Sequence, residues 1–337
     1  MKEFFGLTPK GETAHIYTIS CGQMKAVVSD FGATLVRLYV PDSQGKLDDI
    51  VLGFDSPADY AASSTYLGAT VGRNANRTAN ASIVLGGKTY ALPANDGSNN
   101  LHSGPDSYSF RLWQVENHTE NSITLFLHSP HLDQGFPGNA DIRVTYQLSA
   151  NSLSIRYEGV CDRDTVFNMT NHSYFNLAGH THPEKAMEQV LSMPARFFHP
   201  ASAISIPTGE CRPVDGSPMD FRTPKALNRD IGSDYEPLNL QRGYDHNFEV
   251  FCNPCATLSD PDSGRSMSVY TDCPGVQLYT ANYVDDQGKD GQYYPMRSGV
   301  CLETQFYPDA LHHPQWPQPI VAAGQKYKSE TTYRFSW

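Results

Sequence analysis

Short runs of alternating hydrophobic and polar residues recur along the whole chain, separated by clusters of turn-forming residues. Such alternation is typical of a half-buried β-strand, because successive side chains point to opposite faces of a sheet. We count about twenty such segments, among them His15–Ser20, Ala33–Val40, Ser122–Ser129 and Asp141–Leu148. Their spacing of roughly 8–12 residues predicts a sandwich or a barrel.

One hairpin has a particularly clear signal. Two strand-like runs, Ile83–Leu85 and Lys88–Leu92, are separated only by Gly86 and Gly87. Paired glycines favour the tight two-residue turn that joins antiparallel strands.

Helical signals are few. Ser56–Ala62 and Leu227–Ile231 are expected to form short helical turns, and Glu184–Ser192 a strand or a short helix. Neither a repeat of fixed period nor a low-complexity linker divides the chain. We therefore expect one all-β domain over residues 1–337, built as a large, mostly antiparallel β-sandwich.

Composition narrows the classes of partner. The chain has 337 residues and a net charge of −11, which disfavours nucleic acid and anionic membranes as partners. No apolar run approaches the roughly 18 residues of a membrane-spanning helix, and Met1–Gly6 does not resemble a secretory leader. Seven irregularly spaced cysteines are typical of reduced thiols. We expect a cytoplasmic protein.

Motifs for metal, phosphate and nucleophile chemistry are weak or absent. Cys252 and Cys255 form a single C-x-x-C without a second pair, which is more often structural than metal-binding or redox-active. The chain has no phosphate-binding loop and no nucleophile elbow. His312 and His313 stand in a proline-rich loop and are expected to face solvent. We expect neither a metal nor a cofactor.

The segment Asn171–Leu177, with the sequence NHSYFNL, is unusually rich in amides, hydroxyls and aromatic rings. If it is extended, His172, Tyr174 and Asn176 share one face, while Ser173 shares the other with Phe175. Hydrogen-bonding groups beside an aromatic wall are typical of a site for a small polar ligand. A hydrogen-bonded structural strand is an equally good interpretation of this segment alone.

Glu303 lies within an apolar strand-like run that ends near Gln305. Val300 and Leu302 would point one way, and Cys301 and Glu303 the other. Burying a carboxylate raises its pKa from about 4.3, which suits a general base near neutral pH. A structural carboxylate paired with an arginine is the alternative.

Polar groups in three loops complete the candidate chemistry. Asp245 stands between aromatic residues, as in many sugar sites, although an aspartate after glycine is also a common turn former. Asn76 and Arg77 supply an amide and a guanidinium, and His102 supplies an imidazole. Each of these signals is weak alone, since a loop arginine is usually a solvated surface charge.

Six segments in order nevertheless resemble the galactose mutarotase (aldose 1-epimerase) family. They are Gly72–Arg77, Asn100–His102, Asn171–Leu177, Gly243–Phe248, Pro274–Thr280 and Leu302–Gln305. The resemblance implies a β-supersandwich that interconverts the α and β anomers of free aldohexoses without a cofactor.

The same resemblance implies roles for individual residues. Glu303 would be the general base at the C1 hydroxyl, and His172 the general acid at the ring oxygen. The implied sugar contacts are Asn76, Arg77, His102, Ser173, Tyr174, Asp245 and Gln277.

Two positions depart from the family pattern. Ser103 stands where the family usually has glycine, which matters if this position needs a positive φ. His312 stands where the family often has asparagine. Both departures leave the sugar preference open, with galactose and glucose the expected substrates.

Three other functions remain open on sequence grounds. They are an epimerase of phosphorylated hexoses, a non-catalytic sugar-binding protein on the same fold, and a glycosidase that uses Glu303 and Asp245. We expect a monomer or a homodimer.

Overall fold

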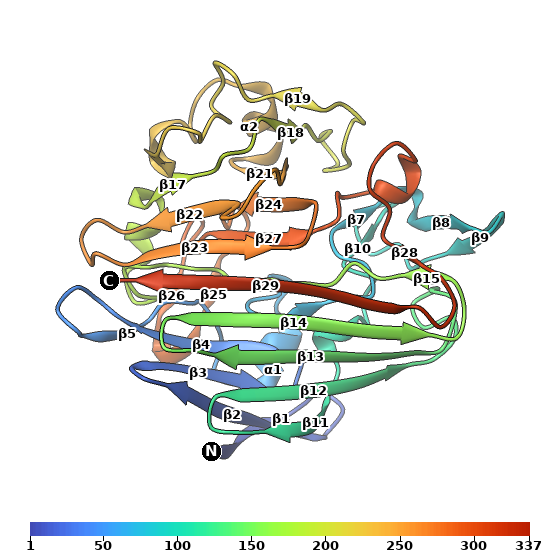
Figure 1. Cartoon of the computed structure of the whole chain (residues 1–337), viewed down its shortest axis with the longest axis horizontal. Helices are drawn as coiled ribbons and strands as arrows, with labels where there is room; N and C mark the ends of the chain where they lie inside the picture. The colour runs from blue at the N-terminus through green and yellow to red at the C-terminus, as the bar shows by residue number, and fades with distance from the viewer.

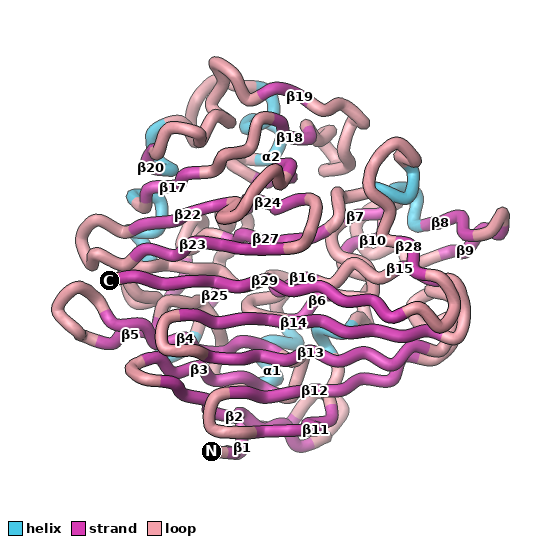
Figure 2. Tube along the Cα trace, viewed as in Figure 1, coloured by secondary structure: helices cyan, strands magenta, loops and turns pink.

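The computed structural model describes all of residues 1–337, and β-strands dominate it (Figure 1, Figure 2). The largest sheet has nine strands in the order β11 (Gln114–His118), β12 (Ser122–Ser129), β13 (Ala140–Leu148), β14 (Ser152–Cys161), β29 (Lys326–Ser336), β23 (Ser266–Thr271), β22 (Ala256–Ser259), β17 (Val190–Ser192) and β20 (Lys225–Ala226).

Two five-stranded sheets lie against it. The first has the order β1 (Lys2–Leu7), β2 (Thr13–Cys21), β3 (Met24–Ser29), β4 (Thr34–Pro41) and β5 (Leu47–Asp49). The second has the order β19 (Arg212–Pro213), β18 (Phe197–His199), β21 (Asp245–Glu249), β24 (Gly275–Tyr279) and β27 (Cys301–Gln305). Neighbouring strands within all three sheets are antiparallel.

The remaining elements are short. The two-stranded pairs are β7 (Arg77–Thr78) with β10 (Asn100–Leu101), β6 (Thr70–Val71) with β16 (Thr170–Asn171), β8 (Ser82–Leu85) with β9 (Lys88–Ala91), β15 (Thr165–Val166) with β28 (Ile320–Val321), and β25 (Asp286–Gln287) with β26 (Tyr293–Tyr294). The α-helices are α1 (Pro57–Ala62) and α2 (Glu236–Gln241), and 3-10 turns span Ala79–Ala81, Tyr108–Phe110, Pro183–Glu188, Leu227–Arg229, Lys289–Gly291 and Ala310–His312.

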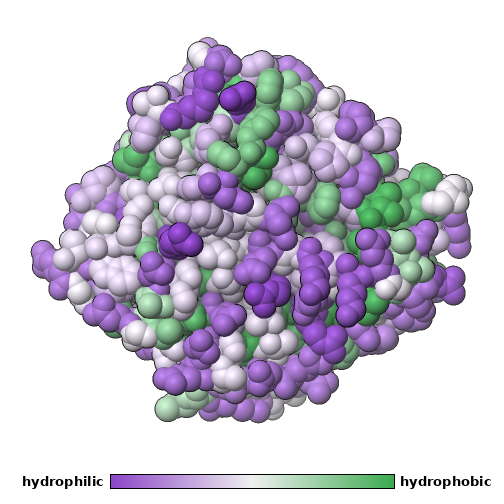
Figure 3. Space-filling view, in the orientation of Figure 1, coloured by the Kyte–Doolittle hydropathy of each residue, from purple (hydrophilic) through white to green (hydrophobic).

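The alternation in the sequence gives the nine-stranded sheet one buried face and one exposed face. Along β13 and β14 every second residue is buried, and the others form a surface that is largely hydrophilic in Figure 3. Ion pairs such as Arg143–Glu116 and Arg156–Glu330 lie on this outer face. The buried face packs against both five-stranded sheets in one core, which contains Val144, Leu38 and Leu302. The β-sandwich expected from the sequence is confirmed.

β24 and β27 are buried on both faces, and this property sets up the functional site. Leu278 and Leu302 point into the core between the sheets. Gln277 and Glu303 stand opposite each other in register on the other face, which is also covered. These two polar side chains are therefore held on a rigid strand pair that is packed on both faces.

Several short elements match the sequence analysis. The Gly86-Gly87 hairpin forms with both glycines at positive φ, and Ser56 caps α1. The 184–192 segment contains both of the expected alternatives, a 3-10 turn followed by β17. Helix α2 was not anticipated. No helix is both long and apolar enough to cross a lipid bilayer.

Candidate active site

The segment 171–177 is a connection between sheets, in which only Asn171 belongs to a strand, the end of β16. Phe175 forms isolated bridges with both Val51 and Val300, so the chain runs between the two five-stranded sheets. Within this short span Asn171 supports the backbone by donating to Gly68 O and accepting from the N–H of Ser173. The amide richness noted in the sequence therefore serves the backbone of an irregular crossing.

This crossing carries His172 to the wall of a cavity of about 660 Å³. Tyr174 stacks on one side of the imidazole at 5.0 Å between ring centroids, and Tyr66 stacks on the other at 6.1 Å. The Tyr279 ring packs nearly perpendicular to the imidazole, at 6.1 Å between ring centroids. His172 is thus held in a single orientation by aromatic rings from separate loops and a strand.

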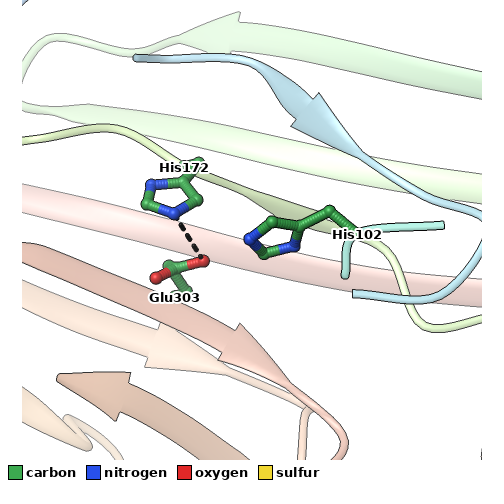
Figure 4. Close-up of side chains that lie close together, drawn as sticks. All are labelled: His102, His172 and Glu303. Carbon is green, nitrogen blue, oxygen red and sulfur yellow. Dashed lines mark ion pairs between the residues drawn. The ribbon is translucent and has the colours of Figure 1, made fainter. Parts of the chain in front are cut away.

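Glu303 faces this imidazole from β27. Its Oε2 lies 3.6 Å from Nε2 of His172, the side chain is 3% exposed, and Oε2 has no hydrogen-bond partner within the protein (Figure 4). The alternative of a structural pair with an arginine is wrong, because the guanidinium of Arg77 pairs with Asp96 at 2.8 Å. An acceptor atom of Glu303 is therefore free for a ligand.

Burial favours the uncharged forms of this pair. It lowers the pKa of His172 to about 4. Burial, reinforced by the nearby Asp245 carboxylate, raises the pKa of Glu303 well above its ordinary value. The second imidazole nitrogen, Nδ1, lies 3.6 Å from the thiol sulfur of Cys301. No carboxylate contacts Nδ1 to stabilise an imidazolium.

His102 is a fixed hydrogen-bond donor beside the pair. Its Nδ1 accepts the backbone N–H of Asn76 at 3.1 Å, and burial lowers its pKa well below the ordinary value. A neutral imidazole that accepts at Nδ1 carries its proton at Nε2. Figure 4 shows the His102 ring directed toward His172 and Glu303 from a separate segment.

Asp245 begins β21 on the floor of the same cavity. Its Oδ1 accepts the side-chain amide of Gln277 at 2.7 Å, and burial raises its pKa. Gln277 does not line this cavity but a smaller adjoining pocket that Asp245 also lines, and its amide orients Asp245. The common turn-forming explanation for Asp245 does not apply, because the residue is paired in register with Tyr279.

Comparisons with known proteins match nearly the full length of this chain to one family. The family model described as aldose 1-epimerase matches residues 15–334. The chain belongs to the aldose 1-epimerase family. It is 38% identical to the galactose mutarotase of Mus musculus, covering 98% of this chain and 97% of that one, and 37% identical to the aldose 1-epimerase of Haemophilus influenzae, covering 93% and 92%.

Solved structures agree with this assignment. The aldose epimerase homologue of C. elegans superposes with a TM-score of 0.89 at 32% identity, covering 96% of this chain and 99% of that chain. The galactose 1-epimerase of Lactobacillus acidophilus gives a TM-score of 0.86 at 27% identity, covering 100% and 98%.

Most of the epimerase residues expected from the sequence come together. Asn76, Arg77, His102, Tyr174 and Asp245 line the cavity with the His172–Glu303 pair. Two expectations about the crossing segment need correction. Ser173 does not line the cavity, because its Oγ donates to Oδ1 of Asn171. Asn176 does not share the cavity face either, because its amide donates to His182 O and accepts from Gln189.

Among the lining residues that the sequence did not point to, three bear directly on the site. Tyr279 stands two positions after Gln277 on β24. Asp96 lies in the amide-rich loop before His102 and orients Arg77. Tyr66 has a φ of 55°, which is uncommon for a bulky residue and is characteristic of strained functional positions. Of these three residues, only Tyr279 could have been found from the sequence, because the alternation along β24 places it on the same face as Gln277.

The two departures from the family pattern have different outcomes. Ser103 does have a positive φ of 70°, and its hydroxyl compensates by accepting from Asn74 N at 2.7 Å and donating to Asn74 O at 2.9 Å. His312 is exposed, as expected, and pairs with Asp309 outside the cavity lining. His313 differs from expectation because it packs on Trp316, with the ring centroids 4.1 Å apart.

The C-x-x-C motif holds no disulfide. All seven cysteines are free, with Cys252 exposed and Cys255 buried.

Proposed function

We propose that this protein is an aldose 1-epimerase that interconverts the α and β anomers of galactose and glucose, with Glu303 as general base and His172 as general acid. The observation that most directly supports this proposal is the 3.6 Å separation between Nε2 of His172 and Oε2 of Glu303 inside a sugar-sized cavity.

This side-by-side arrangement suits the two atoms that exchange protons. The C1 hydroxyl oxygen and the ring oxygen of a cyclic aldose are both bonded to C1, so an acid and a base that serve them must be close neighbours. The two carboxyl groups of a typical glycosidase stand about 5–10 Å apart across the scissile bond. A neighbouring imidazole and carboxylate fit anomer exchange better.

The proton transfers balance within the site. Glu303 removes the proton from the C1 hydroxyl, the C1–oxygen bond becomes a carbonyl, and the bond from C1 to the ring oxygen breaks. His172 gives a proton to the departing ring oxygen. Rotation about C1–C2 presents the other carbonyl face, and the same transfers run in reverse. Carbon is neither oxidised nor reduced, so the reaction requires no redox partner.

Burial sets the proton content of the pair before the sugar binds. Because burial raises the pKa of Glu303 and lowers that of His172, it favours placing the exchangeable proton of the pair on the carboxyl group. Transfer of this proton to the imidazole forms the reactive base and acid together. The adjacent positive charge of Arg77 favours the ionised carboxylate.

The remaining polar groups are suited to hold sugar hydroxyls. His102 offers an N–H, Arg77 a guanidinium, Asn76 an amide and Asp245 a carboxylate acceptor. We include Tyr174 as an aromatic wall beside the ring. Ser173 and Gln277 would act indirectly, through Asn171 and Asp245 respectively.

Charge in the cavity favours a free sugar over a phosphorylated one. Arg77 is the only lysine or arginine among the lining residues, and Asp96 already neutralises it. Asp245 adds a further carboxylate to the lining. A dianionic phosphate would meet a net acidic surface.

We also propose that the whole chain acts as one domain in the cytoplasm. The nine-stranded sheet draws strands from Gln114 through Ser336, and its core is shared with the N-terminal sheet. Seven free cysteines are typical of a reducing compartment. A monomer or a homodimer is the expected assembly.

Polarimetry of freshly dissolved α-D-galactose and α-D-glucose tests the proposal. Equilibration should accelerate in proportion to protein, and Glu303→Gln should lose roughly 10²–10⁴-fold of the rate. Glu116→Gln, which removes a carboxylate from the remote outer face, is the matched control and should keep full activity. Equilibration at the blank rate for both sugars would favour the non-catalytic sugar-binding alternative, and cleavage of a chromogenic glycoside would favour a hydrolase.

A further inference from the structure

A second cluster of metal-ligating side chains lies outside the sugar cavity, on the upper sheet in Figure 1. His199 ends β18, Glu249 ends β21, and Cys211 stands immediately before β19. The Nε2 atom of His199 is 3.5 Å from Oε1 of Glu249, and the Cys211 sulfur is 3.0 Å from the same oxygen. The three potential ligand atoms all lie within 4.8 Å of one another.

The histidine in this cluster is unusual. Its side chain is 0% exposed, yet neither ring nitrogen has a hydrogen-bond partner. Tyr307 and Trp316 hold the imidazole in place, with ring centroids at 4.4 Å and 4.6 Å. Apart from the 3.5 Å contact between Nε2 and the Glu249 carboxylate, this buried imidazole is unsatisfied. Leaving buried polar atoms poorly paired carries a cost, so a fixed imidazole directed at a carboxylate and a thiol indicates a ligand.

We propose that His199, Cys211 and Glu249 form a binding site for Zn²⁺ or a similar borderline-soft divalent cation. Nitrogen, sulfur and oxygen ligands are those that Zn²⁺ accepts, whereas Mg²⁺ and Ca²⁺ prefer oxygen alone. Ligand atoms around tetrahedral zinc are roughly 3–4 Å apart, given bonds of about 2.0–2.3 Å. The measured separations require only small adjustments of the side chains.

Charge and proton balance are consistent with this ion. A thiolate, a carboxylate and a neutral imidazole together neutralise a divalent cation. Without a cation, desolvation and the adjacent Glu249 raise the pKa of the Cys211 thiol to about 12. Metal binding therefore forms the sulfur–metal bond and releases the thiol proton to solvent.

The site would close the base of a loop that reaches the sugar cavity. Residues 200–210 leave from His199 and return at Cys211, and Ala203, Ile204 and Ser205 of this loop line the cavity. An ion held at both ends of the loop would fix this wall. The proposal is distinct from the catalytic proposal, because none of its three ligands lines that cavity.

Cobalt(II) titration of chelator-stripped protein, with a non-thiol reductant, tests the site directly. The wild-type protein should bind one Co²⁺ with a near-ultraviolet band for charge transfer from thiolate to metal. Cys211→Ser should lose this band, while Cys252→Ser, which removes another exposed thiol, should retain it. Glu249→Gln should weaken binding at least tenfold. Absence of the band in the wild type, or its survival in Cys211→Ser, would overturn the proposal.

Thermal unfolding with Zn²⁺ provides a second readout that does not depend on catalysis. Zn²⁺ should raise the Tm of the wild type and of Cys252→Ser by mass action, but not that of Cys211→Ser. His102, His172 and Glu303 also lie close enough together to hold an ion. An equal rise in Cys211→Ser would therefore assign the metal to the sugar cavity and reject the His199 site.

Discussion

Nε2 of His172 lies 3.6 Å from Oε2 of Glu303 in a setting where burial favours the uncharged form of both side chains. A buried pair that is poorly compensated contributes little to stability, and its desolvation cost is substantial. The same pair is well suited to exchange one proton with a sugar, because neither partner is locked in its charged form. This relationship leads to two predictions about pH and stability.

The first prediction concerns the pH dependence of kcat/KM in the free enzyme. Activity should fall as pH drops through about 4, because His172 then gains a proton while Glu303 is already protonated and no base remains. An alkaline limb should appear well above the ordinary pKa of a glutamate, where the pair loses its proton and no acid remains. Polarimetric rates extrapolated to zero buffer concentration measure both limbs. An acid limb near 6.5 would instead indicate an ordinary solvated histidine.

The second prediction separates activity from stability at Glu303. Its folded pKa is raised, so its favourable contribution to the free energy of unfolding is complete below its ordinary pKa and is lost as pH rises through the raised value. Glu303→Gln should therefore have a Tm at pH 8 equal to or above that of the wild type, despite a 10²–10⁴-fold loss of turnover. Tm measured from pH 5 to 8 should show the variant gaining relative to the wild type. A much lower Tm at pH 8 would mean that the carboxylate has a structural role.

The third prediction concerns Ser103, where the family pattern has glycine. Ser103→Ala keeps the positive φ and loses both hydrogen bonds to Asn74, so it should destabilise by about 1–3 kcal/mol. Ser103→Gly also loses the bonds but relieves the backbone strain, so it should cost about 1 kcal/mol less than alanine. Urea denaturation of the two variants provides the comparison. Equal stabilities would show that the strain at this position is negligible.

The fourth prediction concerns Asp96, which orients Arg77 at 2.8 Å. Asp96→Asn keeps the shape but removes the charge, and partly exposed pairs of this kind contribute about 0.2–1 kcal/mol. We expect KM for galactose to rise about 1.5-fold to fivefold, with kcat within about twofold of the wild type. Initial rates over a range of galactose concentrations separate the two constants. A large loss in kcat with unchanged KM would place Arg77 in the chemical step instead.

Much of the fold could be read from local pattern. Alternation identified β12 and β13, paired glycines identified the β8–β9 hairpin, and Ser56 marked the start of α1. These features depend on residues near one another in sequence. Several of the additional strands in the structure are pairs of residues, such as β6 and β16, that are too short to show a period.

The crossing at 171–177 shows where local pattern fails. Its side chains were expected to alternate, but Phe175 forms isolated bridges with Val51, just after β5, and Val300, just before β27, and Asn176 turns to Gln189. A segment whose backbone forms hydrogen bonds with different partners on each side need not keep the regular twist and register of a β-sheet. Distant strands, which a local window does not contain, decided this conformation.

The sequence by itself determined the strands and the two faces of β27, with Glu303 opposite the apolar Leu302, and its resemblance to a family suggested the roles of Glu303 and His172. Tertiary structure decided that His172 contacts Glu303 and that Arg77 forms its ion pair with Asp96 and not with Glu303. It also decided the direction of both pKa shifts. The physical reason is that side-chain alternation is a property of neighbouring residues, whereas proximity and desolvation arise only when distant segments pack together.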